Sequence, residues 1–512
     1  MEIDSQNVER WNRVEISLNG PQVGNPFLEV SLEADFTFKQ REISVRGFYD
    51  GNGVYKIRFM PDEPGQWSFM TRSNQGELDN LKGNFTCVEA SGTNHGPVRV
   101  SNDTHFAFED GKPFYPFGTT SYVWNHQSEE LQKETILTLN ESPFNKIRMC
   151  VFPKYYEYNT AEPALYPFVG EQKKLYSGTF DFTDWMVKES GFDFERFNPQ
   201  FFQKLEQQID ILQKLGIEVD LILFHPYDHW GFASMGKEND LRYLKYIIAR
   251  LGSFRNIWWS MANEYDLMDL AQQKKKDAWD ELIQCVVDED SYQHPISIHN
   301  WHNPPVHAVN NSHWYDHTKE NISHVSIQHD NLFFVPKWHE TYKKPILIDE
   351  CRYEGNINNG WGNMNGKKMV QQFWEGVCRG AYVTHGETYL NENNIVWWSH
   401  GGKLIGESPE RIRFLRKLIE EGGPKRLSPL GAESSHWEVA AGISDDSYVL
   451  IYFGDSQPIF KVFEFLPEGA EFQGDLIDTW NMTITPLEKA VTNQTRIDLP
   501  GQPYMALRLI RK

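Results

Sequence analysis

The pattern of hydrophobic and polar positions divides the chain into three stretches. From about residue 8 to 95, short segments alternate apolar and polar residues between glycine and proline turns, at residues 14–18, 27–36, 42–61 and 65–73. Residues 50–53, Asp-Gly-Asn-Gly, separate two alternating segments and predict a β-hairpin. Regular short strands of this kind are typical of a β-sandwich. Alternation returns near the end of the chain, at residues 436–441, 447–454, 461–466, 472–480 and 504–512, which predicts a second β domain.

The middle stretch alternates strand-like and helix-like segments. Eight apolar runs have the character of strands buried on both faces, at residues 112–120, 144–152, 217–224, 256–263, 295–300, 324–329, 344–350 and 380–387. The predicted fold is therefore multidomain α/β. A central (β/α)8 TIM barrel at 98–423 is flanked by an N-terminal β-sandwich at 1–97 and a small C-terminal β-sandwich at 424–512. An insertion rich in Tyr and Phe, residues 152–196, follows the second strand and is expected to form a wall of the active site.

Two segments of the middle stretch carry a clear helical period. In residues 198–216 one face is apolar and Gly216 stands where a C-terminal cap belongs; the apolar residues are Phe202, Leu205, Ile209 and Leu212. Residues 408–423 repeat this pattern with Ile412, Leu415 and Ile419. Ser408 is the expected N-cap of that second helix.

Composition and charge narrow the classes of partner. The 512 residues are 40% hydrophobic and 14% aromatic, far from the composition of a disordered chain. The formal net charge of −21 argues against nucleic acid and against anionic membrane surfaces as partners. Tyr and Trp, which combine a flat apolar body with a polar tip, suit the stacking of sugar rings. A carbohydrate substrate is therefore compatible with the composition, and a homo-oligomer is left open.

The cysteines and the N-terminal residues predict a cytoplasmic protein. The five cysteines, Cys87, Cys150, Cys285, Cys351 and Cys378, show no CxxC spacing, so neither a disulfide framework nor a zinc site is expected. Residues 1–16 are polar and lack the apolar core of a secretory signal. No apolar run is long enough to span a bilayer.

Two carboxylates at strand ends carry the candidate chemistry. Asn263 and Glu264 end the fourth predicted strand, and Glu350 ends the seventh. Glycoside hydrolysis requires two carboxyl groups that flank the glycosidic bond, one protonated and one ionised. Strands four and seven face each other across a barrel, so the two side chains can converge on one bond. Asp349 competes with Glu350, but period-2 alternation is expected to turn only one of the two inward, and Glu350 is preferred.

Other strand-end residues are candidates for sugar binding. Arg148 is expected to brace Glu350 through a charge-assisted hydrogen bond that keeps the carboxylate ionised. His225 either touches a sugar hydroxyl or supports another residue. Trp124 and Trp398 are candidates for stacking, although either could be core. The remaining candidates are His299, Trp301, Gln328, His385 and Glu387, with Tyr155 and Tyr156 on the inserted segment.

Residues 225–230, His-Pro-Tyr-Asp-His-Trp, are a candidate metal site, because they bring His225, Asp228 and His229 close together. The segment lacks the helical i, i+4 histidine pair and the cysteine ligands of common zinc motifs. The sequence therefore predicts no metal and no cofactor, although a Ca²⁺ ion in a β domain stays open. No nucleophile elbow, phosphate loop or dinucleotide fingerprint stands in its required context.

The barrel resembles the clan A retaining glycoside hydrolases, in which Asn-Glu ends strand four and a nucleophilic Glu ends strand seven. Residues 96–122, 380–390 and 397–402 are similar to apiosidase-like glycosidases that have an N-terminal β-sandwich and a small C-terminal β domain. The resemblance implies that Glu264 is the general acid/base and Glu350 the nucleophile. It also implies that Asn263 hydrogen-bonds the hydroxyl next to the anomeric carbon.

The function expected from these features is a retaining, exo-acting glycosidase for small glycosides or oligosaccharides. Retention requires carboxyl groups roughly 5–5.5 Å apart. Two alternatives remain, an endo-acting glycanase on the same pocket and a carbohydrate-binding protein that has lost activity. The sequence does not identify the sugar, its ring form or its anomeric configuration.

Overall fold

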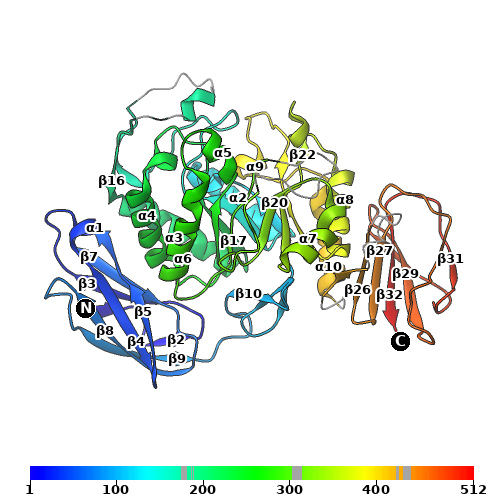
Figure 1. The fold of residues 1–512 in the computed structure, drawn as a ribbon, viewed down its shortest axis with the longest axis horizontal. Helices are drawn as coiled ribbons and strands as arrows, with labels where there is room; N and C mark the ends of the chain where they lie inside the picture. The colour runs from blue at the N-terminus through cyan, green and yellow to red at the C-terminus, as the bar shows by residue number, and fades with distance from the viewer. Residues whose placement is uncertain (174–181, 186, 188, 303–313, 422–425, 431–439) are drawn as a thin grey trace.

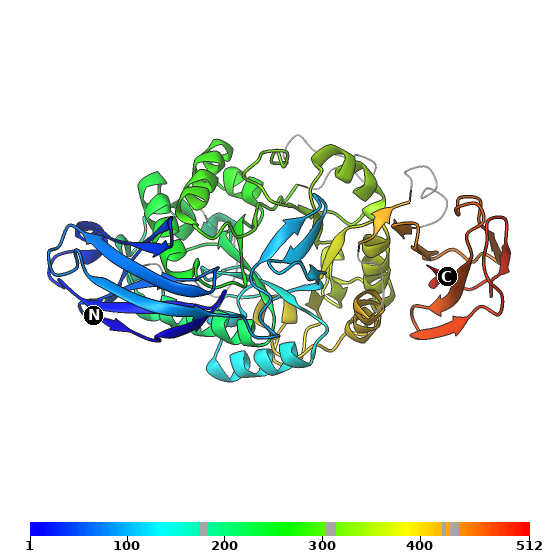
Figure 2. The ribbon, with the colours of Figure 1, turned by 90° about the horizontal axis from the view of Figure 1, so that it is seen from below.

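Three domains lie in a row, with the barrel in the middle (Figures 1 and 2). The computed structural model describes residues 1–173, 182–185, 187, 189–302, 314–421, 426–430 and 440–512. The domain boundary expected between residues 423 and 424, and the first part of the strand expected at 436–441, lie outside the described residues. Within the described part of the chain, no helix has both the length and the apolar character needed to cross a membrane.

The N-terminal domain is a β-sandwich, as the sequence predicts. One sheet has the order β1-β3-β7-β6, with bounds Glu2–Ile3, Val14–Asn19, Val54–Phe59 and Phe48–Gly51. The other has the order β2-β9-β8-β4-β5, with bounds Asn7–Glu9, Lys82–Val88, Gly65–Ser73, Leu32–Phe38 and Arg41–Arg46. The predicted hairpin at 50–53 joins β6 and β7. The strand expected at 27–36 begins only at Leu32, because Pro26 starts a short helix, α1 (Pro26–Glu29).

The central domain is a barrel of eight parallel strands, which confirms the predicted fold class. Its strands are β13 (Gly118–Thr120), β14 (Lys146–Cys150), β17 (Glu218–Phe224), β18 (Ile257–Ala262), β19 (Ile296–Ser297), β20 (Val325–Gln328), β21 (Ile346–Glu350) and β23 (Tyr382–His385). They pair in the order β19-β18-β17-β14-β13-β23-β21-β20. A single parallel bridge between His299 and Ser326 links the two end strands and closes the ring.

A small antiparallel sheet lies across the barrel at the ends where the strands begin. It consists of β10 (Val98–Ser101), β11 (His105–Phe108) and β12 (Pro113–Phe114). Its rings of Phe106 and Phe114 lie 4.8 and 6.2 Å from the ring of Trp258, near the start of β18. The predicted strand at 112–120 is therefore two strands, and only Gly118–Thr120 belongs to the barrel. The candidate site lies at the opposite end of the barrel, where the strands finish.

Helices surround the barrel (Figure 1). They are α2 (Glu129–Glu141), α3 (Pro199–Lys214), α4 (Lys237–Leu251), α5 (Tyr265–Leu270), α6 (Trp279–Glu289), α7 (Val335–Tyr342), α8 (Gly366–Cys378), α9 (Trp397–His400) and α10 (Ser408–Glu420). The apolar faces predicted for α3 and α10 are buried. Gly216 follows α3 with φ +71°, the left-handed conformation of a C-terminal cap. The N-cap prediction for Ser408 is wrong, because Ser408 is already the first helical residue and Glu407 occupies the cap position.

Two short strand pairs lie in loops of the barrel, and a C-terminal β domain completes the chain. In the segment 152–196 after β14, β15 (Phe168–Gly170) pairs with β16 (Phe192–Phe197). After β21 and β23, β22 (Glu354–Gly355) pairs in parallel with β24 (Glu387–Thr388). The C-terminal domain has a sheet of β25 (Ser428–Pro429), β26 (Ala440–Ser444), β27 (Tyr448–Tyr452), β32 (Met505–Arg511), β29 (Phe472–Asp478) and β30 (Thr483–Pro486). The pair β28 (Phe460–Val462) and β31 (Arg496–Asp498) lies beside it.

A buried ion network joins the N-terminal domain to the barrel. Arg58 of β7 lies 2.9 Å from Glu206 of α3 and 2.8 Å from Glu15 of β3. Arg250 of α4 hydrogen-bonds Glu206 and lies 2.8 Å from Asp50. The two arginines overcome burial and hold the pKa of Glu206 at about 2. The network therefore fixes the sandwich against two barrel helices.

Candidate active site

A cavity of about 640 Å³ lies at the end of the barrel where the strands finish. Both candidate catalytic carboxylates, Glu264 and Glu350, line it. Its other lining residues are Tyr156, Glu157, Tyr158, Trp185, Tyr227, Trp301, Gln328, Asp330, Arg352, Tyr353, Asn359, Gly360, Trp361 and Trp398. Most of these residues come from loops that follow strands β14, β17, β19, β20, β21 and β23. The cavity therefore has the position of an active site in a TIM barrel.

Glu264 sits at a strained turn directly after β18. Its backbone has φ 54° and ψ 50°, in the left-handed region that costs a residue with a Cβ roughly 1 kcal/mol or more. The hydroxyl of Tyr227 donates a hydrogen bond to its Oε2. Burial raises the pKa of Glu264 to about 8, and the negative charge of Glu350 adds to this rise. Glu264 is thus protonated at neutral pH, as a general acid must be.

A β-bulge brings Asp349 and Glu350 to the same side of β21. Ile327 of β20 is paired with Ile348, but Gln328 is paired with Glu350, so Asp349 is an extra residue in the ladder. The expectation that only one of the two carboxylates faces inward is therefore wrong. Asp349 is buried within the barrel and accepts hydrogen bonds from Lys146, Ser326 and Thr384, whereas Glu350 reaches the cavity.

Arg148, Asn263 and Tyr122 hold the Glu350 side of the site. Nη1 of Arg148 lies 3.7 Å from Oε1 of Glu350, an ion pair rather than the hydrogen bond expected from the sequence. Nη2 of the same guanidinium donates to Oδ1 of Asn263 at 3.2 Å. The hydrogen bond to Oε1 of Glu350 comes from the hydroxyl of Tyr122. Nδ2 of Asn263 is buried and makes no hydrogen bond with a described residue, so it is available to a ligand.

Lys154 places a cation beside the two tyrosines that support the carboxylates. Its Nζ lies 3.7 Å from the ring centroid of Tyr122 and 3.8 Å from that of Tyr227, the tyrosines that hydrogen-bond Glu350 and Glu264. Burial lowers the pKa of Lys154 to about 8, while both carboxylates oppose this decrease. When charged, Lys154 lowers the pKa of Glu264. A single side chain therefore limits the rise in the pKa of Glu264 and packs on both supporting tyrosines.

Several residues expected from the sequence line the cavity. Trp301 is 38% exposed, and its backbone amide donates to Asp266 at 2.6 Å. Trp398 contacts the rings of Tyr156 and Trp361, with centroid distances of 5.4 and 5.0 Å. Gln328 lies at the edge of the cavity, next to β21. His299 lies below, with Nε2 4.0 Å from Oε1 of Glu350.

Other expected residues lie away from the cavity. Trp124 is fully buried in the main hydrophobic core, because it belongs to a short helical turn that packs inward. Nε2 of His225 donates to the carbonyl of Phe152 at 3.2 Å, so this histidine braces the neighbouring loop. Tyr155 stacks on His229 with ring centroids 3.8 Å apart. His385 and Glu387 are buried beside Glu354, outside the cavity lining.

The segment 225–230 does not gather metal ligands. The carboxylate of Asp228 accepts hydrogen bonds from the backbone amides of Trp230, Gly231 and Ala233, which fixes the loop. Nε2 of His229 lies 2.9 Å from Glu162. Asp228 therefore stabilises the loop after β17, and His229 joins this loop to Glu162.

Sequence reasoning missed the residues that support the carboxylates. Tyr122 follows the first strand by two residues, and Tyr227 and Lys154 follow the third and second strands. Their positions after barrel strands were the available signal. Trp361 lies eleven residues beyond Glu350 in a loop without regular pattern, and only the fold brings it to the cavity.

Comparison with protein families divides the chain at nearly the same places as the fold. The family described as apiosidase-like, catalytic domain, matches residues 100–437. Two domains of unknown function, DUF5060 and DUF5605, match residues 7–74 and 437–510. Among curated proteins, none matches this chain.

Solved structures similar to this chain are described as glycoside hydrolases. A candidate glycoside hydrolase from Bacteroides vulgatus ATCC 8482 is 37% identical, with a TM-score of 0.90 over 99% of this chain and 100% of that one. A family 5 glycoside hydrolase from the same organism is 15% identical, with a TM-score of 0.58 over 81% of this chain and 94% of that one. A further glycoside hydrolase is 14% identical, with a TM-score of 0.59 over 81% and 97%. At these two lower identities the likeness concerns the fold alone.

Proposed function

The chain belongs to the apiosidase-like family of glycosidases, and we propose that it cleaves O-glycosidic bonds of small glycosides or oligosaccharides by a retaining, exo-acting mechanism. The observation that carries the proposal is the unequal environment of two carboxyl groups at one cavity. Glu264 is kept protonated by burial and by the charge of Glu350. Glu350 faces the guanidinium of Arg148 and accepts a hydrogen bond from Tyr122.

In the first proposed step, a carboxylate oxygen of Glu350 attacks the anomeric carbon. The glycosidic bond breaks, and its oxygen takes the proton of Glu264. In the second step, ionised Glu264 takes a proton from water as the water oxygen attacks the anomeric carbon. The bond to Glu350 breaks, and the sugar leaves with its original configuration. Asn263 is proposed to donate from Nδ2 to the hydroxyl next to the anomeric carbon.

The size and walls of the cavity support a small substrate. Its volume of about 640 Å³ falls within the range of small-molecule sites, roughly 300–1,000 Å³. Trp361, Trp398 and Tyr353 offer flat apolar faces on one side, and Trp301 offers another. This arrangement favours the release of terminal sugars over cleavage within a polymer. We also propose a cytoplasmic setting, in keeping with five free, buried cysteines.

The test is hydrolysis of a panel of aryl pyranosides and furanosides, including an apiofuranoside. We expect one substrate to be cleaved, and we expect Glu350→Gln and Glu264→Gln to lose most of the rate on it. Glu340→Gln, a change of an exposed glutamate on α7 outside the cavity lining, should retain the rate. Full activity of Glu350→Gln would refute the proposed nucleophile. A wild type that binds sugars but cleaves none would favour the inactive binding protein.

Products from an oligosaccharide distinguish the two modes of cleavage. An exo-acting enzyme releases single sugars from the first time point. A mixture of internal fragments at early times would contradict the exo-acting part of the proposal and favour an endo-acting glycanase.

A further inference from the structure

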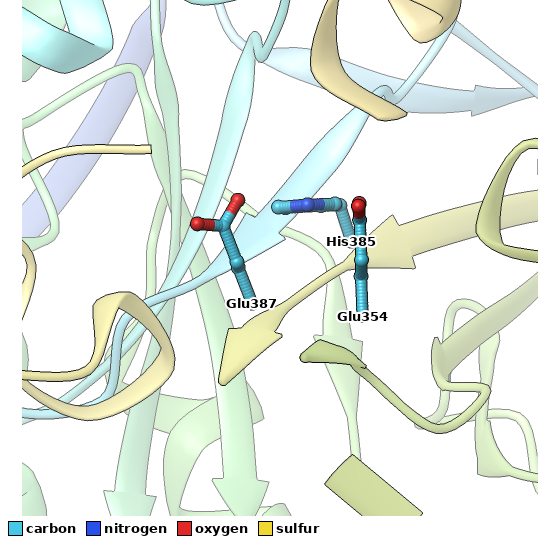
Figure 3. Close-up of side chains that lie close together, drawn as sticks. All are labelled: Glu354, His385 and Glu387. Atoms are coloured by element: carbon cyan, nitrogen blue, oxygen red, sulfur yellow. The ribbon is translucent and has the colours of Figure 1, made fainter. Parts of the chain in front are cut away.

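Three buried acid and imidazole side chains meet behind the wall of the cavity (Figure 3). Glu354 and Glu387 are register partners on the parallel strands β22 and β24, and His385 ends β23. Oxygens of both carboxylates and a ring nitrogen of His385 lie within 4.8 Å of one another. Figure 3 shows both glutamate side chains on the same side of their strands, with the imidazole beside their carboxyl groups.

The two carboxylates are buried without a balancing side-chain cation among the described residues. Glu354 and Glu387 are 0% and 1% exposed. Oε1 of Glu387 accepts from the amide of Ile405 at 2.7 Å, and Oε1 of Glu354 accepts from that of Glu407 at 2.8 Å. Oε2 of Glu387 makes no hydrogen bond with a described residue. Because two buried like charges side by side are unfavourable, the pair requires either a shared proton or a cation.

The imidazole of His385 favours the cation. Its Nδ1 lies 3.1 Å from the hydroxyl oxygen of Thr119, which also accepts from Nε1 of Trp397 at 2.9 Å. Nε2 is buried and makes no hydrogen bond with a described residue. A neutral imidazole offers the lone pair of one ring nitrogen to a metal ion. A second hydrogen bond that orients the ring is the usual setting of a metal-binding histidine.

The backbone leaves room at the point where the ligand atoms converge. A Cβ on Gly406 would lie 2.7 Å from Oε2 of Glu387 and 2.8 Å from Oε2 of Glu354, so the two oxygens face the same small space. Ligand atoms around a tetrahedral zinc ion lie roughly 2.0–2.2 Å from the metal and therefore roughly 3.4 Å from one another. Side-chain shifts of about an ångström would bring the three groups to this geometry.

We propose that Glu354, His385 and Glu387 bind a divalent transition-metal ion of the Zn²⁺ or Mn²⁺ class. The nitrogen ligand disfavours Ca²⁺ and Mg²⁺, which prefer oxygen alone. The role is structural, because the ion would join β22, β23 and β24, while its two glutamate ligands hold the loop before α10 through the amides of Ile405 and Glu407. Tyr353 precedes Glu354; its carbonyl accepts a hydrogen bond from the amide of Met364, and its amide donates to the carbonyl of Trp361. The ion would therefore stabilise the part of the cavity wall that Tyr353 and Trp361 form. This inference does not depend on the proposed chemistry of Glu264 and Glu350.

The first experiment measures metal in the full-length protein by mass spectrometry, after exposure to Zn²⁺ or Mn²⁺ and removal of free ions. We expect stoichiometric binding of one of the two ions. Chelation should lower the Tm, and adding that ion alone should restore it, with a change of roughly 5 °C at saturation. A protein that retains neither ion, and whose Tm does not change when either ion is added, would overturn the proposal. That result would leave the proposed glycosidase activity untouched.

Variants locate the ion. Glu387→Gln keeps the shape of the side chain and removes a charged ligand, so it should bind no stoichiometric metal and lose the Tm response. The matched control is Glu375→Gln, because Glu375 is also a buried glutamate, on α8, with Gln371 as its partner. This control should bind metal as the wild type does. Wild-type metal binding by Glu387→Gln would place the ion elsewhere and contradict the proposed site, whereas a Tm raised by that substitution in the absence of any metal response would indicate a shared proton.

Discussion

Removing the hydroxyl of Tyr227 should shift the alkaline limb of the pH–rate profile toward higher pH. In the wild type, this hydroxyl donates to Oε2 of Glu264 and stabilises the ionised carboxylate, which opposes the effect of burial on its pKa. Tyr227→Phe leaves the ring in place and removes only the donor. The ionised form of Glu264 then becomes less stable, so its pKa rises further above the wild-type value of about 8. Since the first step needs protonated Glu264, kcat/KM should persist to higher pH.

The size of this shift follows from the strength of one hydrogen bond to a charged group. Such a bond contributes roughly 1.5–3 kcal/mol, and one pKa unit corresponds to about 1.4 kcal/mol, so the limb should move by roughly one to two units. The assay is kcat/KM against pH for the substrate identified by the panel. Tyr122→Phe is the matched control, because its hydroxyl donates to Glu350, and its alkaline limb should stay near that of the wild type. An unchanged or lowered limb in Tyr227→Phe would refute the assignment of Glu264 as the acid.

Three further substitutions test the surroundings of the site and the fold. Lys154→Met removes a cation that lowers the pKa of Glu264, so the alkaline limb should rise by about one unit; an unmoved limb would limit Lys154 to packing. Trp361→Ala removes a proposed stacking face and should raise KM about tenfold with little change in kcat, whereas an unchanged KM would exclude contact with the sugar. Glu206, whose pKa is about 2 instead of 4.5, stabilises the fold above pH 4.5 and loses this contribution as the pH falls toward 2. Glu206→Gln should therefore lower the Tm by calorimetry at pH 7, through a loss of about 3 kcal/mol, and much less at pH 3; equal losses at both pH values would contradict the linkage.

The sequence was sufficient for the fold because the periodic signal was strong. Each of the eight apolar runs contains a barrel strand, and Glu264 and Glu350 follow or end the fourth and seventh. In a parallel barrel, the strand ends meet at one mouth whatever the loops do, so the two carboxylates could be placed together. The predicted start of the strand at 27–36 is wrong, because Pro26 begins a helix there.

The details of the site depended on irregular structure that a periodic pattern does not encode. The bulge at Asp349 breaks the alternation that would turn Asp349 and Glu350 to opposite faces of β21. Trp124 and Trp361 are both tryptophans near strand ends, yet one is core and the other lines the cavity, because their loops fold differently. The cluster of Glu354, His385 and Glu387 comes from two segments about thirty residues apart, and it has no motif spacing.

The most direct test of the central claim is to trap the covalent intermediate. A 2-fluoro aryl glycoside of the sugar identified by the panel should form a glycosyl-enzyme that hydrolyses slowly, because the fluorine destabilises the oxocarbenium-like transition states of both steps. Peptide mapping by mass spectrometry should then find the sugar on Glu350, and Glu350→Gln should remain unlabelled. Labelling of Asp349 or Glu387 would contradict the proposed nucleophile. Turnover with inversion at the anomeric carbon, without any labelled peptide, would contradict the retaining mechanism itself.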